Sequence, residues 1–373
     1  MTEIRPIQPE DIPGLMGLVA RVDFPYRSHT GWHWALFENP QQAGFPAGFV
    51  AVRDKKVVGV VGFQVRDFIH QGTPVHCATG HTFITGPEGR GCGGALALTA
   101  INHPGMAAVY SINNNARSAG LYKKIGMRAW LGAGGRRRME WPIRPAAMWT
   151  GIGFSRLARH HDKLYDLLSA RERFRTRAAT LADIAADVLP AEEVLGLENP
   201  ADADLIDQFG KAVCDARTTA PVRTPAFYAY QASDPDAPGR TLLLAARGGG
   251  KLAGLMQVIL TKPNAFEPAE LEITDLEVHP AAARAETLAD LVGKACKLAK
   301  TAGAARLRLL YAGRFSSDDL KKTGFRLARQ YGHDPAHASF APGMEGFAGT
   351  WQPTGFEGDF HFALRVAPQT KPG

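Results

Sequence analysis

The sequence predicts an α/β (α+β) protein made of two tandem copies of one fold, each a mixed, mainly antiparallel sheet flanked by helices. First, a chain of 373 residues is longer than a usual single domain. Second, the hydrophobic period runs strand, helix, three strands, helix, strand, helix, strand, and most of this order recurs in the second half. With 45% hydrophobic and 21% charged residues, the chain can bury two cores.

The elements of the first copy follow from local patterns. IRPIQ predicts a short strand, and PEDIPGLMGLVARV has the start and spacing of an amphipathic helix. A hairpin follows in GFVAVRDKKVVGVVGFQV, turning at Asp54 to Lys56, and HCATGHTFIT is a strand. The glycine-rich PEGRGCGGAL then leads into a helix, MAAVYSI is a strand, and ARSAGLYKKIG is a helix closed by Gly126. MRAWLGAGG begins a last hairpin.

The second half repeats this order with informative differences. TLLLAARGGGKLAGLMQVIL matches the first hairpin, LEITDLEVHP matches HCATGHTFITGP, and DDLKKTGFRLA matches GLYKKIGMRAW. We therefore expect a binding and catalytic domain over 1–145, a basic helical connector over 146–195, and a degenerate second copy over 196–373. Where the first copy has PEGRGCGGAL, the second has PAAARAETLADL without glycines, and Leu320 stands for Tyr122. Without glycines that turn cannot approach a pyrophosphate closely.

Composition narrows the function classes. The net charge of +7 favours anionic ligands without naming one. No apolar run approaches the ~20 residues that span a bilayer, and the N-terminus has no signal core, so we expect a cytoplasmic protein without a membrane span. The basic stretches 135–145 and 156–177 lack a recognised nucleic-acid module, and we expect no nucleic-acid partner. No metal site or disulfide frame is expected from four cysteines without a C-x-x-C pair: Cys77, Cys92, Cys214 and Cys296.

The glycine-rich loop matches G-x-G-x-x-G by letter, but its surroundings exclude two common phosphate loops. A dinucleotide-binding fingerprint requires an opening βαβ unit and an acidic residue after the next strand. Here that strand runs into Asn113, Asn114 and Asn115. A phosphate-loop NTPase requires lysine followed by serine or threonine, which the loop lacks. Backbone N–H groups at the start of a helix nevertheless suit an anion.

Two motifs of the first copy resemble those of the GCN5-related N-acetyltransferases (GNAT). The loop motif Q/R-x-x-G-x-G/A follows a proline at Pro87 and is matched by Arg90, Gly91, Cys92, Gly93, Gly94 and Ala95. The later motif N-x-x-(A/S)-x-x-L-Y-x-x-x-G-(F/M) is matched by Asn115, Ser118, Leu121, Tyr122, Gly126 and Met127. In the second copy, only the strand before the loop and the KKTGF helix end carry the resemblance.

The resemblance implies an acetyl-CoA site in the first copy. The amides of 90–95 would hold the pyrophosphate, with Asn115 and Ser118 as further cofactor contacts. The pantetheine arm would pair with the backbone of Phe83, Ile84 and Thr85. Tyr122 stands where relatives place the general acid, and His81 stands where they often have a glutamate base. A histidine suits neutral pH; His81 is alternatively a strand histidine with satisfied hydrogen bonds.

The acceptor side is less defined. Trp32, His33 and Trp34 lie after the first helix, a region that covers the acceptor in GNAT proteins, and could stack on a sugar. Alternatively, this helix packs on the sheet. The C-terminal TWQPTGFEGDFHF presents Trp351, Glu357 and Asp359 in a turn-rich strand pair; its carboxylates would bind an ammonium acceptor if the tail folds back, or would be solvated turn residues.

The expected function is therefore transfer of an acyl group from acetyl-CoA, without a metal, to a primary amine of a small molecule. The layout loosely resembles bacterial two-lobed GNAT proteins associated with surface polysaccharide, which implies an amino sugar or sugar-nucleotide acceptor. Two alternatives stay open: a Fem-type aminoacyl transferase, and a non-catalytic regulatory protein that binds CoA or another nucleotide. The sequence leaves the oligomeric state open, with a homodimer among the options.

Overall fold

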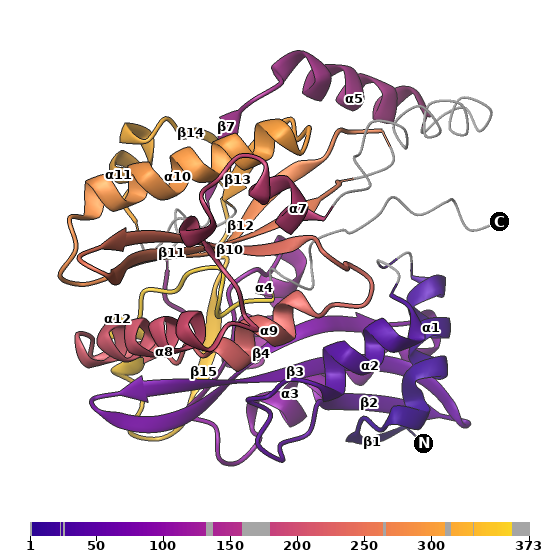
Figure 1. Cartoon of the computed structure of the whole chain (residues 1–373). Helices are drawn as coiled ribbons and strands as arrows, with labels where there is room; N and C mark the ends of the chain where they lie inside the picture. Colours follow the sequence, from indigo (N-terminus) through magenta and orange to yellow (C-terminus); the bar gives the residue numbers. More distant parts are fainter. Residues whose placement is uncertain are drawn as a thin grey trace.

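The computed structural model describes residues 2–22, 24, 27–131, 137–158, 180–263, 266–309, 315–330 and 332–359. In these ranges the chain forms an α/β structure with two mainly antiparallel sheets, each flanked by helices (Figure 1). The predicted fold class is confirmed. No helix in the described part is both long and apolar enough to span a bilayer.

The first sheet is built mostly from the N-terminal half. In spatial order its strands are β1 (Glu3–Pro6), β2 (Gly48–Arg53), β3 (Lys56–His70), β4 (Thr73–Thr85), β5 (Ala108–Ser111), β15 (His337–Phe340) and β6 (Arg128–Ala129), with β9 (Thr219–Pro221) beside the end of β3. Among the described strands of this sheet, only β4 and β5 pair in parallel. The residues of β2 and β3 that alternate between the two faces belong to two different hydrophobic clusters.

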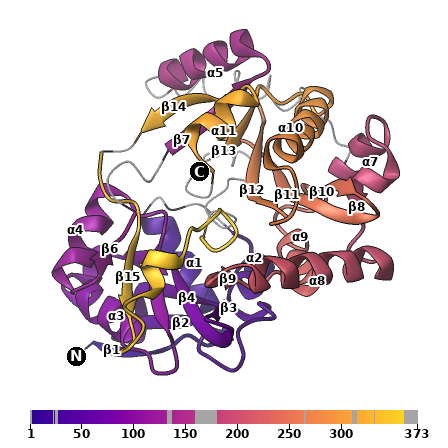
Figure 2. The same cartoon turned by 90° about the vertical axis from the view of Figure 1, so that its left-hand side faces the viewer.

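Helices cover both faces of the first sheet. One cluster joins the sheet to α1 (Ile12–Arg21), which follows the 3-10 turn Pro9–Asp11, and to α2 (His29–Phe37). The other joins it to α3 (Cys92–Ile101). The helix α4 (Ala116–Lys124) lies at the end of the sheet that contains β15 and β6 (Figure 2).

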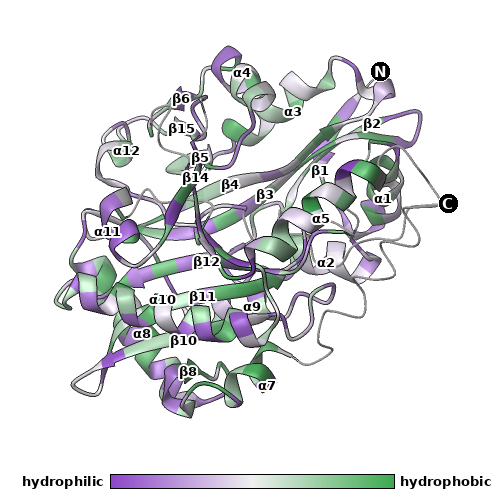
Figure 3. Ribbon diagram, turned by 90° about the horizontal axis from the view of Figure 1, so that it is seen from above, coloured by the Kyte–Doolittle hydropathy of each residue, from purple (hydrophilic) through white to green (hydrophobic). Residues whose placement is uncertain are grey.

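The second sheet has a matching meander. Its spatial order is β14 (Arg326–Gln330), β7 (Arg137–Pro142), β13 (Arg306–Leu309), β12 (Glu270–Val278), β11 (Lys251–Thr261), β10 (Thr241–Gly248) and β8 (Val194–Leu195). Here the parallel pair is β12 with β13. In Figure 3 much of β11 is green, in agreement with its buried apolar side chains.

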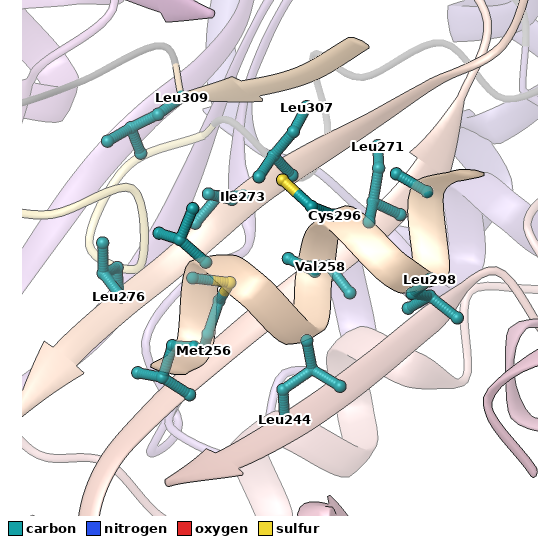
Figure 4. Packing of buried hydrophobic residues seen from close by; sticks show 14 of the residues in the cluster. Leu244, Met256, Val258, Leu271, Ile273, Leu276, Cys296, Leu298, Leu307 and Leu309 are labelled. Carbon is teal, nitrogen blue, oxygen red and sulfur yellow. The ribbon is translucent and has the colours of Figure 1, made fainter. Parts of the chain in front are cut away.

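Two helix layers flank the second sheet. On one face, α10 (Arg284–Thr301), α7 (Leu181–Ala186) and α11 (Ser317–Lys322) pack on a large core, and Figure 4 shows Met256, Val258 and Cys296 in it. On the other face lie α8 (Pro200–Asp215) and α9 (Pro225–Ala232). The remaining elements are α5 (Pro145–Ala158), α12 (Phe347–Thr350) and the 3-10 turns Pro87–Gly89 and Ala191–Glu193.

The two halves exchange strands. β7 follows the first-half strands in the chain but pairs with β13 and β14 in the second sheet. β15 comes from the C-terminal half but lies between β5 and β6 in the first sheet. The hairpin expected from MRAWLGAGG therefore does not form between β6 and β7. The physical reason is that Met139 of β7 is fully buried in the core of the second sheet.

The C-terminal segment 351–359 folds back between the two sheets. The Tyr110 hydroxyl donates to the Glu357 carbonyl at 2.7 Å, and the Thr354 hydroxyl donates to Oδ1 of Asp275 at 2.9 Å. The strand pair expected in this segment is absent from 351–359, which consists of turns and irregular chain. Residues 360–373, and residues 159–179 of the basic helical connector expected over 146–195, lie outside the described residues.

Candidate acyl-CoA site

β4 and β5 separate from each other halfway along β4. They pair at Cys77–Ala108, Ala78–Val109 and Thr79–Tyr110, and β5 ends one residue later at Ser111. β4 continues to Thr85 while remaining paired with β3 on its other edge. In the described residues no strand pairs with the open edge of 80–85, which contains the predicted pantetheine contacts Phe83, Ile84 and Thr85. An extended chain with amide groups can add to such an edge.

A bulge shapes this open edge. Between Val60 and Gly62 of β3 the register with β4 shifts. Thr82 at the bulge has φ of +50°, which is strained for a β-branched residue. Such strain is retained where the surrounding structure fixes it, and it often marks functional sites.

The glycine-rich loop begins directly after this edge. Gly91 has φ of +90° and precedes α3, which starts at Cys92. A side-chain Cβ at Gly89 would lie 2.3 Å from the Val58 carbonyl oxygen, so the loop is packed tightly on β3. The strand, turn and helix that the sequence predicts around this loop are therefore present as β4, the 3-10 turn Pro87–Gly89 and α3.

The first turn of α3 presents backbone amides to open space. The first four N–H groups of a helix have no acceptor inside it, and here these belong to the N-cap Gly91 and to Cys92, Gly93 and Gly94. A Cβ placed at Gly91 or Gly94 would have no atom within 4 Å. The Cys92 side chain points the other way and is buried in the core. The turn can thus approach an anion with its backbone alone.

Tyr122 lies on α4. The Ser111 side chain at the end of β5 hydrogen-bonds to it. Burial, followed by the charge of Asp359, raises the pKa of Tyr122 to about 12, whereas the Ser111 hydrogen bond opposes the rise. The phenol therefore keeps its proton at neutral pH and is available as a proton donor.

Asn115 and Ser118 begin the helix that carries Tyr122. The Asn115 side-chain oxygen accepts a hydrogen bond from the Ser118 backbone N–H at 2.9 Å, as an N-cap does. The structure gives both residues this capping role; contact with a cofactor stays a prediction.

His81 lies on β4 just before the bulge. Its side chain is 3% exposed, and its ring covers Gly62, where a Cβ would come within 2.2 Å of the imidazole. Burial, then the charges of Arg66 and Arg27, lower the pKa of His81 to about 3. A base with so low a pKa provides little driving force for taking a proton from an ammonium group. The geometry favours the alternative of a neutral strand histidine.

The aromatic residues proposed for the acceptor are divided between two environments. Trp32 and Trp34 are 2% and 1% exposed and belong to two hydrophobic clusters. Trp34 stacks on Tyr230 of α9 at 4.7 Å, because α2 lies between the first sheet and α9. His33 is half-buried, and its Nδ1 atom lies 3.0 Å from Oε1 of Glu38. In this structure neither indole face is open to an acceptor, and both tryptophans act in packing.

In the C-terminal segment Trp351 and Glu357 are buried, and Asp359 is half-buried. Glu357 is 1% exposed and accepts hydrogen bonds from the Thr354 amide at 2.8 Å and from Nε1 of Trp351 at 3.2 Å. Burial raises the pKa of Glu357. Burial is the main cause that raises the pKa of Tyr122 and of Tyr110, and the charge of Asp359 adds to it. Of the two alternatives for this segment, folding back onto the first half is therefore the one observed.

Sequence reasoning missed a buried polar region next to the site. Arg66 of β3 is 1% exposed, lies 4.4 Å over the Phe227 ring and donates to the carbonyl of Val65 and to Gln64. In the second half of the chain, Arg223 forms a buried ion pair with Asp275 of β12 at 2.9 Å. The sequence does contain a pattern that indicates this region: polar residues stand two positions apart within otherwise apolar strands, as in GFQVRDF and LEITDLEV.

No protein-family model and no curated protein sequence matches the chain. Solved structures do match. A GCN5-related N-acetyltransferase from Anabaena variabilis is 14% identical, with 91% of this chain and 73% of that chain covered and a TM-score of 0.52. N-myristoyltransferase from Saccharomyces cerevisiae, solved with myristoyl-CoA and inhibitors, is 11% identical, with 90% and 79% covered and a TM-score of 0.54.

The chain has the GNAT fold. A conserved Enterococcus faecalis protein of unknown function shares it at 10% identity, with 91% and 73% covered and a TM-score of 0.53. At these identities the likeness establishes the fold alone. Its binding and catalytic residues must be argued from the geometry described above.

Proposed function

We propose that this chain is an N-acyltransferase that moves an acyl group, acetyl in the simplest case, from CoA to a primary amine of a small molecule. The observation that carries the proposal is the separation of β4 from β5, with the glycine-rich loop at one end and Tyr122 at the other. One extended thioester substrate would contact all three features.

Each part of the donor has a matching feature. The pyrophosphate suits the free amides of 91–94, where a hydrogen bond to a charged group is worth about 1.5–3 kcal/mol. The amide-containing pantetheine arm suits the unpaired edge of 83–85. The thioester would then lie near Tyr122. The net charge of +7 favours the approach of a polyanionic donor.

The reaction requires two proton movements. The amine nitrogen attacks the thioester carbon and loses a proton, and the C–S bond breaks with its electron pair on sulfur. Tyr122 donates its proton to that sulfur and is reprotonated by the proton released from the amine. Because the pKa of His81 falls to about 3, we place no base role on it. The Asp359 charge, close enough to raise the pKa of Tyr122, suits attraction of the ammonium acceptor.

The acceptor stays defined only as a small amine. An amino sugar or sugar-nucleotide remains the proposed acceptor from the sequence resemblance. Stacking on Trp32 or Trp34 does not support it, since both indoles are buried. The acidic C-terminal segment supports a cationic acceptor of any scaffold.

The test combines binding with turnover. We expect acetyl-CoA to raise the Tm, since a ligand at 100 times its Kd adds about 2.7 kcal/mol of stability. Free-thiol release should then follow with at least one amine in a panel of amino sugars and simple amines. If neither acetyl-CoA nor longer acyl-CoAs bind, the proposal is wrong. Tight binding without thiol release would indicate a regulatory CoA-binding protein, and transfer from aminoacyl-tRNA would indicate a Fem-type enzyme.

A further inference from the structure

His337 is brought next to Tyr122 by the exchanged strand β15. In the ladder between β15 and β5, His337 lies directly opposite Ser111. Opposite residues of an antiparallel pair lie on the same face with their Cβ atoms about 5 Å apart. Ser111 hydrogen-bonds to Tyr122, and the rings of Tyr122 and His337 have centroids 5.9 Å apart. A residue from the C-terminal half thus joins the site of the first sheet.

The hydrogen bonds of Asn114 fix which nitrogen of His337 carries the proton. The Asn114 side-chain nitrogen donates to the Asp334 carbonyl oxygen at 3.2 Å, which sets the orientation of the amide. The same nitrogen lies 3.1 Å from Nδ1 of His337. Because an amide nitrogen only donates, Nδ1 must accept, and the proton of the neutral ring is on Nε2.

Within the described part of the chain, that Nε2–H group has no acceptor. His337 is 0% exposed, and its Nε2 atom has no hydrogen-bond partner among the described residues. A buried donor without a partner costs about 1–3 kcal/mol, and native structures seldom retain one without a reason. The unpaired donor lies in the immediate surroundings of the proposed general acid.

We propose that His337 is a positioning residue for Tyr122, whose Nε2–H group donates a hydrogen bond to the tyrosine oxygen, directly or through one water, when that oxygen loses its proton. The proposal rests on the acyl-transfer function proposed above. Catalytic hydrogen bonds are often long in the free enzyme and tighten with the substrates bound.

The hydrogen bond from His337 leaves the proton transfers of the reaction unchanged. The proton of Tyr122 moves to the sulfur as the C–S bond breaks, and negative charge stays on the tyrosine oxygen. His337 transfers no proton; it stays neutral and stabilises that charge as a donor. Burial lowers the pKa of His337, aided by Lys123 and His333 and opposed by Asp334, so the ring is neutral at pH 7. The ring of Tyr122 on α4 also faces the imidazole. After burial, the charge of Asp359 is the next cause that raises the pKa of Tyr122.

The kinetic test uses the full chain with two substitutions at one position. His337→Leu removes the donor, and His337→Gln keeps an N–H group near the position of Nε2. We expect His337→Leu to lower kcat about tenfold, the effect of one hydrogen bond to a charged group, with an unchanged KM for acetyl-CoA. His337→Gln should recover most of the loss. In the Tyr122→Phe background, His337→Leu should cause no further loss.

Other outcomes would overturn the role of His337. These are equal losses in both variants at an unchanged Tm, a loss that persists fully in the Tyr122→Phe background, or wild-type kcat in His337→Leu. If His337→Leu does not fold, two other measurements test the role of His337. These are the kcat of His337→Gln relative to wild type and the imidazole NMR spectra of the next paragraph. A wild-type chain that releases no thiol with any amine contradicts the proposed function instead.

A second measurement does not need activity. In ¹H–¹⁵N imidazole spectra, with the His337 signal assigned by its loss in His337→Gln, we expect the Nε2–H tautomer from pH 7 to 8. The Nε2 signal should shift between wild type and Tyr122→Phe. An Nδ1–H tautomer, or a signal insensitive to Tyr122, would overturn the inference whether or not the chain proves to be an acyltransferase.

Discussion

Gly94→Ala should affect stability and anion binding at the glycine-rich loop in opposite directions. Gly94 lies in the first turn of α3 without a positive φ, and a Cβ there would have no atom within 4 Å. Alanine should therefore raise the free energy of unfolding by about 0.5 kcal/mol, the lower end of the helix-interior range. If the pyrophosphate lies against this amide, the methyl group blocks one charged hydrogen bond. That loss of about 1.5–3 kcal/mol weakens the affinity for acetyl-CoA roughly 10- to 150-fold.

The assay is calorimetric titration with acetyl-CoA beside thermal unfolding of the free protein. Gly293→Ala is the matched control, because Gly293 is a glycine of α10 whose Cβ would also have no atom within 4 Å. The control should gain stability and keep the wild-type affinity. If Gly94→Ala also binds acetyl-CoA like wild type, the loop does not hold the pyrophosphate and the site argument fails.

Three further predictions concern separate features. Tyr122→Phe should lower kcat about 100-fold if the phenol is the general acid, and unchanged kcat would remove it from the mechanism. The folded-state pKa of His81 is lowered to about 3 from 6.5, so only the unfolded chain gains this proton between these values and stability falls with falling pH. His81→Gln should abolish about 2 kcal/mol of the stability lost between pH 7 and 5, measured by urea unfolding; an equal pH dependence in both proteins would contradict the assignment. Asp275→Ala removes the ion pair of the buried Arg223 at 2.9 Å and leaves it Glu277 at 3.6 Å, so it should cost about 3 kcal/mol, the lower end for a broken buried pair. Asp215→Ala, at an exposed pair, should unfold like wild type.

Local patterns predicted the elements that depend on neighbouring residues. The first hairpin turns at Asp54 and Lys55, both with positive φ, where the sequence places its turn. The glycine-rich loop follows β4 and opens α3 as the motif requires. These features arise from turn chemistry and hydrophobic period, which a single sequence displays.

Long-range features could not be predicted in the same way. Residue spacing does not show which sheet accepts a short strand, and so the exchange of β7 and β15 was missed. An aromatic pair on a helix suits packing and ligand stacking equally, and only the position of α9 shows that Trp34 is covered. The His337 contact depends on that exchange, because residues 111 and 337 meet only through β15.

The exchange also makes the domain limits testable. The division at 1–145 and 196–373 stays a prediction, and β15 fills the position between β5 and β6 in the first sheet. A fragment of residues 1–145 lacks β15, leaves the edge of β5 unpaired and exposes Met139, which is buried against the second sheet. An open hydrophobic edge favours aggregation. We therefore expect this fragment to lack a cooperative thermal transition and a dispersed NMR spectrum, whereas the full chain shows both. If the fragment folds cooperatively alone, the first half does not need the exchanged strand β15 to fold. The contact of His337 with Tyr122 would then not be a required part of the folded first half.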